Sequence, residues 1–140
     1  MSQFYIGTKQ VFAYPQTGKD GRNGYAVIYD HGTTQQYQSW SPKEVFEKAY
    51  LPHGHGQNES KINPQMVKEF IKSSTVKTEG KTTIVHAVLA NGFEIVESSS
   101  CVDPANYDEK LGTEICMKRI EDKIWNLLGF ALQWARTGIK

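Results

Sequence analysis

The sequence predicts an α+β fold, with an antiparallel β-sheet packed by a long C-terminal helix and a small β-rich module before it. One observation is Asn91-Gly92 between two apolar runs, which predicts a β-hairpin because both turn positions favour positive φ. Another is a set of apolar residues at helical spacing near the C-terminus, which predicts an amphipathic helix. These residues are Leu111, Ile115, Ile120, Ile124, Trp125 and Leu128.

The first fifty residues predict the β-rich module. Residues 9–14, 24–30 and 35–40 are rich in β-branched and aromatic side chains, which favour strands. A helix over residues 42–50 follows, with Ser41 as the N-cap, Pro42 at the first helical position and Glu44 completing a capping box. Residues 53–61 have two glycines and no apolar periodicity. We therefore expect an accessory module at 1–52, a linker at 53–61 and a ligand-binding or oligomerisation core at 62–140.

The second half predicts the sheet and its helix. A helix begins at Asn63-Pro64 and ends near Ser73, and strands follow over residues 75–78, 81–90 and 93–99. Asn106 as N-cap and Glu109 three residues later predict the start of the long helix. That helix runs to about residue 128, and the tail after it either continues the helix or forms a last apolar segment. We expect Trp125 to anchor the core or an interface, so that its removal costs ~3–5 kcal/mol.

A two-residue loop at Asn91-Gly92 would fix the register of the hairpin. Ala90 would then face Phe93, and His86 would face Glu97 on the same side of the sheet. The His86–Glu97 pair has two interpretations: a cross-strand polar pair, or a hydrogen-bonding pair at the edge of an apolar ligand cleft. The first face would carry Ile84, His86, Val88, Phe93, Ile95 and Glu97, and the opposite face Val85, Ala87, Leu89, Glu94, Val96 and Ser98.

Charge and hydropathy exclude several classes of protein. Sixteen Lys and Arg against fifteen Asp and Glu give a net charge of +1. This overall charge predicts no general electrostatic attraction to nucleic acid or to an anionic membrane. We find no apolar stretch of about 18 residues and no secretory signal, and therefore expect a cytoplasmic protein. In that compartment Cys101 and Cys116 are expected to be free thiols.

The sequence gives little support for catalysis or a metal. The run Ser98-Ser99-Ser100-Cys101 stands in no nucleophile motif and is explained by a strand end. Two histidines, His53 and His55, are close, but no further ligands follow at zinc-like spacing. We therefore expect no enzyme, no metal site and no cofactor.

A local group of cations is the better candidate for binding. Arg119 and Lys123 are four residues apart and share a helix face, with Lys118 beside them. Arg119 borders the apolar stripe, from which its guanidinium could reach a phosphate. The alternative is an ordinary solvated helix face, and the sequence favours neither.

Residues 82–132 also resemble a family of small phage-encoded proteins. The shared elements are N-G-F, a serine-rich S-x-C-V-D-P-x-N-[FY]-D segment, a glycine one turn into the helix, and K-I-W-x-L-x-G-F. Proteins of this kind are similar to the Thoeris anti-defence (Tad) sponges, which sequester cyclic ADP-ribose isomers without cleaving them. The resemblance implies a cytoplasmic protein of the infected host that forms a homo-oligomer built from dimers, such as a hexamer.

The resemblance implies a ligand such as gcADPR, or a cyclic di- or trinucleotide. Such a ligand needs a stacking surface, hydrogen bonds to base or ribose, and cations for its phosphates. Arginines are among the family's binding positions, whereas between Ser98 and Trp134 this chain has only Arg119. The alternative function is a phage accessory protein that binds a host protein or nucleic acid. The candidate ligand-binding residues are His86, Asn91, Phe93, Glu97, Tyr107, Lys118, Arg119 and Lys123.

Overall fold

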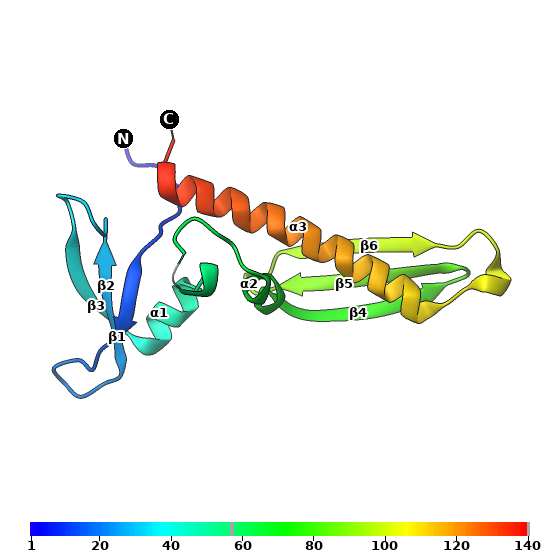
Figure 1. Cartoon of the computed structure of the whole chain (residues 1–140), viewed down its shortest axis with the longest axis horizontal. Helices are drawn as coiled ribbons and strands as arrows, with labels where there is room; N and C mark the ends of the chain where they lie inside the picture. The colour runs from blue at the N-terminus through cyan, green and yellow to red at the C-terminus, as the bar shows by residue number, and fades with distance from the viewer. Residues whose placement is uncertain (57, 140) are drawn as a thin grey trace. The chain divides into compact units, whose positions relative to one another are not determined.

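A computed structural model describes residues 1–56 and 58–139 and divides them into two compact units. The first comprises residues 1–52 and the end of the C-terminal helix from Ala131, and the second comprises residues 53–130. Each unit contains a three-stranded antiparallel sheet (Figure 1). The predicted α+β class is confirmed. Among the described residues, no helix has the length and apolarity needed to cross a membrane.

The elements follow one another as two β-meanders, each accompanied by helices. The strand orders are β1-β2-β3 and β4-β5-β6. The first unit contains β1 (Phe12–Pro15), β2 (Gly24–Tyr29), β3 (Tyr37–Pro42) and α1 (Lys43–Ala49). The second contains η1 (Gly54–Gly56), α2 (Pro64–Glu69), β4 (Ile71–Glu79), β5 (Thr82–Leu89), β6 (Glu94–Ser100), η2 (Pro104–Asn106) and most of α3 (Glu109–Thr137).

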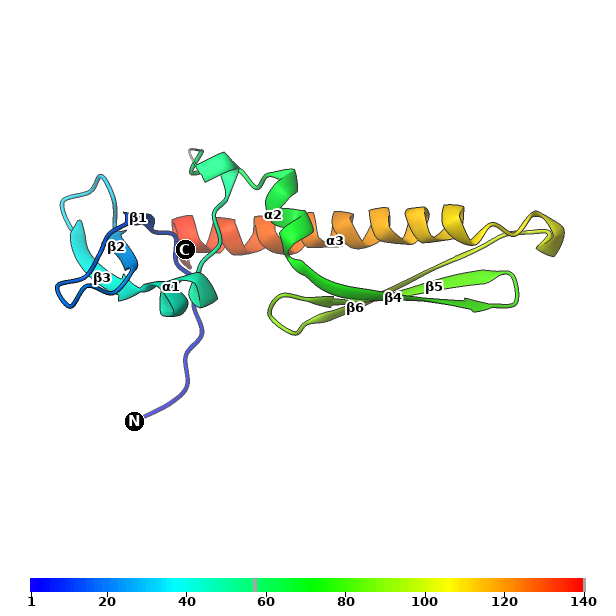
Figure 2. The ribbon, with the colours of Figure 1, turned by 90° about the horizontal axis from the view of Figure 1, so that it is seen from below.

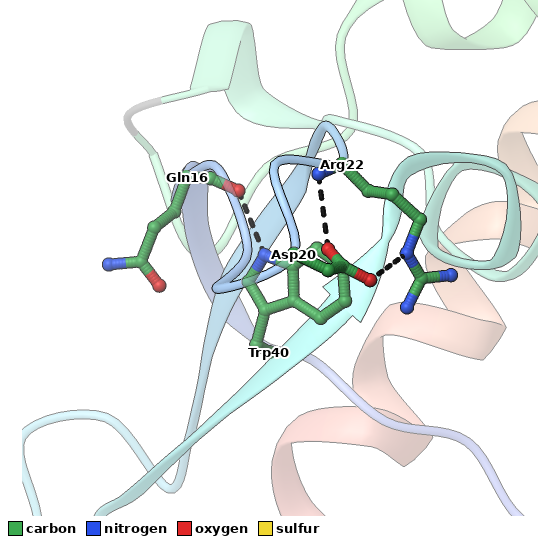
Figure 3. A network of polar contacts seen from close by, with 4 residues as sticks. All are labelled: Gln16, Asp20, Arg22 and Trp40. Carbon is green, nitrogen blue, oxygen red and sulfur yellow. Dashed lines mark hydrogen bonds and ion pairs between the residues drawn. The ribbon is translucent and has the colours of Figure 1, made fainter.

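In the first unit, the loop between β1 and β2 wraps around the indole of Trp40 (Figure 3). The indole Nε1 donates to the carbonyl of Gln16 at 2.8 Å, and the Arg22 guanidinium lies 5.4 Å from the ring centroid. Asp20 holds Arg22 there through its carboxylate. A Cβ on Gly24 would lie 2.4 Å from the Trp40 ring, so this close approach requires glycine.

Two predicted helix starts are wrong in the same way. Ser41 pairs with Tyr25 inside β3, and α1 begins only after Pro42, without a side-chain cap. Asn106 lies in η2, and the carboxylate of Asp108 accepts from the backbone N–H of Leu111 at the start of α3. Strand pairing takes Ser41 out of the cap position and leaves α1 without a side-chain cap, whereas at α3 the neighbouring Asp108 replaces Asn106.

The predicted second helix is too long. Its proline start is correct, but α2 ends at Glu69, and Ile71 already belongs to β4. The strand β4 is correspondingly longer than predicted and contains a β-bulge between Ile71 and Ser73.

The core of the second unit lies between α3 and one face of the sheet β4-β5-β6. Figure 2 shows the helix as one layer and the three strands as the other. Leu111 and Trp125 are 53% and 36% exposed, so their predicted place in the apolar stripe is wrong. The residues that α3 buries recur every fourth position: Gly112, Cys116, Ile120, Ile124 and Leu128. The last four of them pack with Val67, Val85, Ala87, Leu89 and Ile95.

The predicted hairpin is present, but its register is shifted by one residue. The N–H of Leu89 donates to the carbonyl of Phe93 at 2.7 Å, which closes a loop of three residues instead of two. Gly92 adopts φ +88°, the left-handed conformation expected of a three-residue loop. His86 therefore stands opposite Val96 and not Glu97. The β5 halves of both predicted faces are correct, but the residues of β6 change places, so that Ile95 lies on the buried face with Ala87.

Candidate functional site

An open groove runs between β6 and α3 in the second unit. Its volume is about 400 Å³. Phe93 stands at the hairpin end with 57% of its surface exposed, and Leu127 is 44% exposed. Large exposed apolar side chains beside a cation are typical of a binding surface. The groove is lined by Phe93, Glu94, Ile95, Val96, Lys123, Asn126 and Leu127.

The cations of α3 are anchored on β6. Lys123 Nζ donates to the carboxylate of Glu97 at 2.5 Å, and one turn earlier Arg119 Nη1 donates to the carbonyl of Ser98 at 2.7 Å. The Glu97 side chain is only 15% exposed, whereas that of Lys123 is 53% exposed. Lys123 has three donor hydrogens, so this ion pair leaves it donors for a ligand in the groove.

The edge of β6 supplies main-chain polar groups to the same groove. Because Leu89 and Phe93 form a hydrogen-bonded pair, the odd-numbered residues of β6 direct their N–H and C=O groups at β5. The even-numbered residues direct theirs outward, as the contact of Arg119 with the Ser98 carbonyl confirms. The N–H and C=O groups of Glu94 and Val96 therefore point away from β5, at an edge where both residues line the groove.

The predicted polar pair on the sheet has a different partner. His86 Nε2 contacts Glu94 Oε1 at 2.5 Å, diagonally across the outer face of the sheet. Glu97 lies on the opposite face, toward α3. The predicted His86–Glu97 pairing is therefore wrong, for the same reason as the register.

The remaining predicted ligand-binding residues do not line the groove. The Tyr107 hydroxyl bonds the hydroxyls of Thr78 at 2.9 Å and Thr83 at 2.8 Å, at the far end of the sheet from Phe93. Asn91 accepts from the N–H of Phe93 at 3.1 Å and thereby stabilises the turn. Lys118 is exposed, and five helical positions place it about 140° around α3 from Lys123.

The groove thus gathers Phe93 and Lys123 from the prediction, with Arg119 and Glu97 beside it. Sequence reasoning missed Asn126 and Leu127, although both stand one turn after Lys123 on the same helix face, where the helical period could have found them. It also missed Glu94, because that residue depends on the register.

The two thiols and His53 of the second unit are buried or make hydrogen bonds within the fold. Cys116 is fully buried, and this burial raises the pKa of its thiol. Cys101 Sγ donates to the carbonyl of Asp103 at 3.3 Å. His53 Nδ1 lies 2.7 Å from the carbonyl of Lys61. Within residues 1–56 and 58–139, no three His, Cys, Asp or Glu side chains gather as metal ligands.

Comparison with known families matches residues 62–135, more than half of the chain. The chain belongs to the phage protein (N4 Gp49/phage Sf6 gene 66) family. The match extends from the residues before α2 into the last turns of α3 and includes every residue that lines the groove. In this phage protein, β1, β2, β3 and α1 lie outside the matched region. No curated protein and no solved structure matched the chain.

Proposed function

We propose that this phage protein is an anti-defence protein that binds a cyclic nucleotide immune signal in the β6–α3 groove and holds it without cleavage. The signal we propose is a cyclic ADP-ribose isomer, with cyclic di- and trinucleotides as related ligands. The observation that carries the proposal is the meeting of an exposed ring, Phe93, with Lys123 and Asn126 around one open groove.

Each groove residue suits one part of a nucleotide. The exposed face of Phe93 can stack on a base. The Lys123 ammonium can donate to a phosphate, and the Asn126 amide can both donate and accept at a ribose or base edge. The open N–H and C=O groups of Glu94 and Val96 can add hydrogen bonds without any side chain.

The charge around the groove makes the proposal more specific. Glu97 already neutralises Lys123 in the free protein, and Arg119 is the neighbouring cation. A ligand with two phosphates therefore needs both of these cations of α3. We propose that the protein binds it as a homo-oligomer built from dimers.

Differential scanning fluorimetry with a panel of cyclic ADP-ribose isomers, cyclic dinucleotides and cyclic trinucleotides tests the proposal. A ligand that binds only the folded state raises the melting temperature. The bound ligand is then released by denaturation and examined by chromatography. We expect one ligand class to raise the melting temperature and to be recovered intact, whereas recovery of cleaved ligand would argue for an enzyme.

Variants of the groove residues test whether the ligand binds in the groove. Lys123→Met and Phe93→Ala are each expected to weaken binding at least about tenfold, the loss of one charged or stacking contact. Lys118→Met removes an equal charge from α3 outside the groove and is the matched control. Glu97→Gln removes the counter-charge of Lys123 and is expected to tighten binding several-fold. Equal losses from Lys118→Met and Lys123→Met would place the ligand elsewhere.

The alternative outcome is that no small ligand shifts the melting temperature. The exposed groove would then be assigned to a host protein or nucleic acid, as the second function predicted from the sequence. Affinity for nucleic acid would fall steeply with salt.

A further inference from the structure

The sheet of the second unit has two edges, and they differ. At the β6 edge, Arg119 of α3 donates to the outward carbonyl of Ser98. At the β4 edge, no backbone hydrogen bond reaches the outward groups of residues 73–79 within the described part of the chain. A long open edge is a template for another strand.

The hydrogen-bonding pattern shows which groups of β4 are open. The N–H of Ala90 donates to the carbonyl of Phe70 at 2.7 Å, so the even-numbered residues of β5 face β4. Their partners on β4 are odd-numbered, as in the pairs His86 with Thr75 and Ile84 with Lys77. The even-numbered residues therefore direct N–H and C=O groups away from the sheet. In the regular part of the strand these are Ser74, Val76 and Thr78.

We propose that β4 pairs antiparallel with β4 of a second copy of this chain, about a twofold axis at Val76, to form one six-stranded sheet. The β-bulge between Ile71 and Ser73 ends the regular part of the strand, which then runs over residues 73–79. Val76 is the midpoint of that stretch. Twofold pairing at Val76 thus uses every regular residue of the edge, and it is isologous, as a closed dimer requires.

The side chains fit this register. Val76, which is 43% exposed on the α3 side of the sheet, would stand opposite Val76 of the second copy. Ser74 would stand opposite Thr78. On the other side of the sheet, Lys77 would face Thr75 and Glu79 would face Ser73, so no like charges lie directly opposite each other.

Sedimentation velocity of the full chain, with a matched pair of proline variants, tests the proposal. Proline removes the N–H of the residue it replaces. Val76→Pro and Val96→Pro make the same change at two exposed edge valines whose N–H groups both point away from the sheet. Neither variant removes a hydrogen bond between strands of one copy.

We expect the wild-type chain and Val96→Pro to sediment with about twice the 15.8 kDa mass of one chain, and Val76→Pro to sediment as a monomer at the same concentration. A monomeric wild type would overturn the proposal. So would a dimer that both variants weaken equally, because the contact would then lie on another surface. Circular dichroism checks that each variant is folded.

A cross-link tests the register and does not depend on how proline is tolerated. Residues in a hydrogen-bonded antiparallel pair have Cα atoms ~5.5 Å apart, within the range of a disulfide. In a Cys101→Ser background, Val76→Cys is expected to form a disulfide-linked dimer under mild oxidation. Thr75→Cys in the same background would stand opposite Lys77, and its own copies would be too far apart to bridge. Cross-linking by Thr75→Cys but not by Val76→Cys would overturn the register.

Discussion

At the scale of single residues, Gly112 sets how closely α3 approaches the sheet. It is buried against Thr83, and a Cβ at this position would lie 2.3 Å from the Thr83 hydroxyl oxygen. Thr83 is itself fully buried and bonded to Tyr107, so it has little freedom to move. The glycine in the resemblance motif, one turn into the helix, therefore has a packing role.

A pair of glycine variants measures this close contact. Gly112→Ala is expected to lower the free energy of unfolding by about 1–3 kcal/mol, because overpacking outweighs the gain in helix propensity. Gly129→Ala, in the same helix with nothing within 4 Å of its added Cβ, is expected to raise that free energy by up to ~1 kcal/mol. Urea denaturation measures both, and equal effects would contradict the role of Thr83.

Cys116 gives the stability of the protein a dependence on pH. Burial raises the pKa of this thiol from its ordinary value of 9.0, with Arg119 opposing the rise. The unfolded chain therefore releases the proton at a lower pH than the folded chain. Stability from this group is fully present below about pH 9 and is lost as pH rises toward the folded pKa.

The measurement is the free energy of unfolding from about pH 7 to about pH 10 for the wild type and Cys116→Ala. We expect the wild type to lose stability more steeply than the variant above about pH 9, although the variant is less stable throughout because of its cavity. Parallel curves would mean that the thiol titrates equally in both states.

At the scale of elements, α3 buries a narrow stripe, and Trp125, one of its two tryptophans, lies outside that stripe. Ile124→Ala is expected to lower the free energy of unfolding by about 2–5 kcal/mol, because Ile124 is fully buried. Trp125→Ala should cost less than Ile124→Ala by at least about 1 kcal/mol, since Trp125 is 36% exposed. Urea denaturation of both variants decides this, and a larger loss at Trp125 would contradict the orientation of the helix.

Sequence patterns predicted the helices and strands of this protein better than the packing and register between them. The strand at residues 24–30 and the helix starting at Pro64 were predictable because β-propensity and proline act locally. The set of residues that α3 buries was not predictable, because Gly112 and Cys116 are less hydrophobic than Trp125, which is exposed. The groove was predictable only in part. Phe93 follows the turn in either register, but Phe93, Glu94 and Glu97 all change faces when the register moves by one residue.

At the scale of the whole molecule, the two units have unequal cores. The hydrophobic cluster of the second unit and the residues packed against it all lie between Ile62 and Leu128. Within residues 1–52, the buried hydrophobic residues are Ala26 and Val27. Stability depends on buried apolar area, so the second unit has the better basis for folding alone.

Separate expression of the two parts tests this difference. A fragment of residues 53–140 is expected to melt cooperatively by circular dichroism, with a transition close to that of the full chain. A fragment of residues 1–52 is expected to show no cooperative transition. A non-cooperative melt of the longer fragment would show that its core depends on the first unit.

The three-residue loop Ala90-Asn91-Gly92 has a consequence for how this protein can change over generations. Substitutions at Ala90, which is exposed and stands outside both strands, alter no pairing. Deletion of one loop residue would turn Ile95 toward solvent and Glu94 toward the core, and so exchange the two surfaces of β6 at once. Sequence changes at this hairpin should therefore accumulate as replacements and avoid changes of length between Leu89 and Phe93.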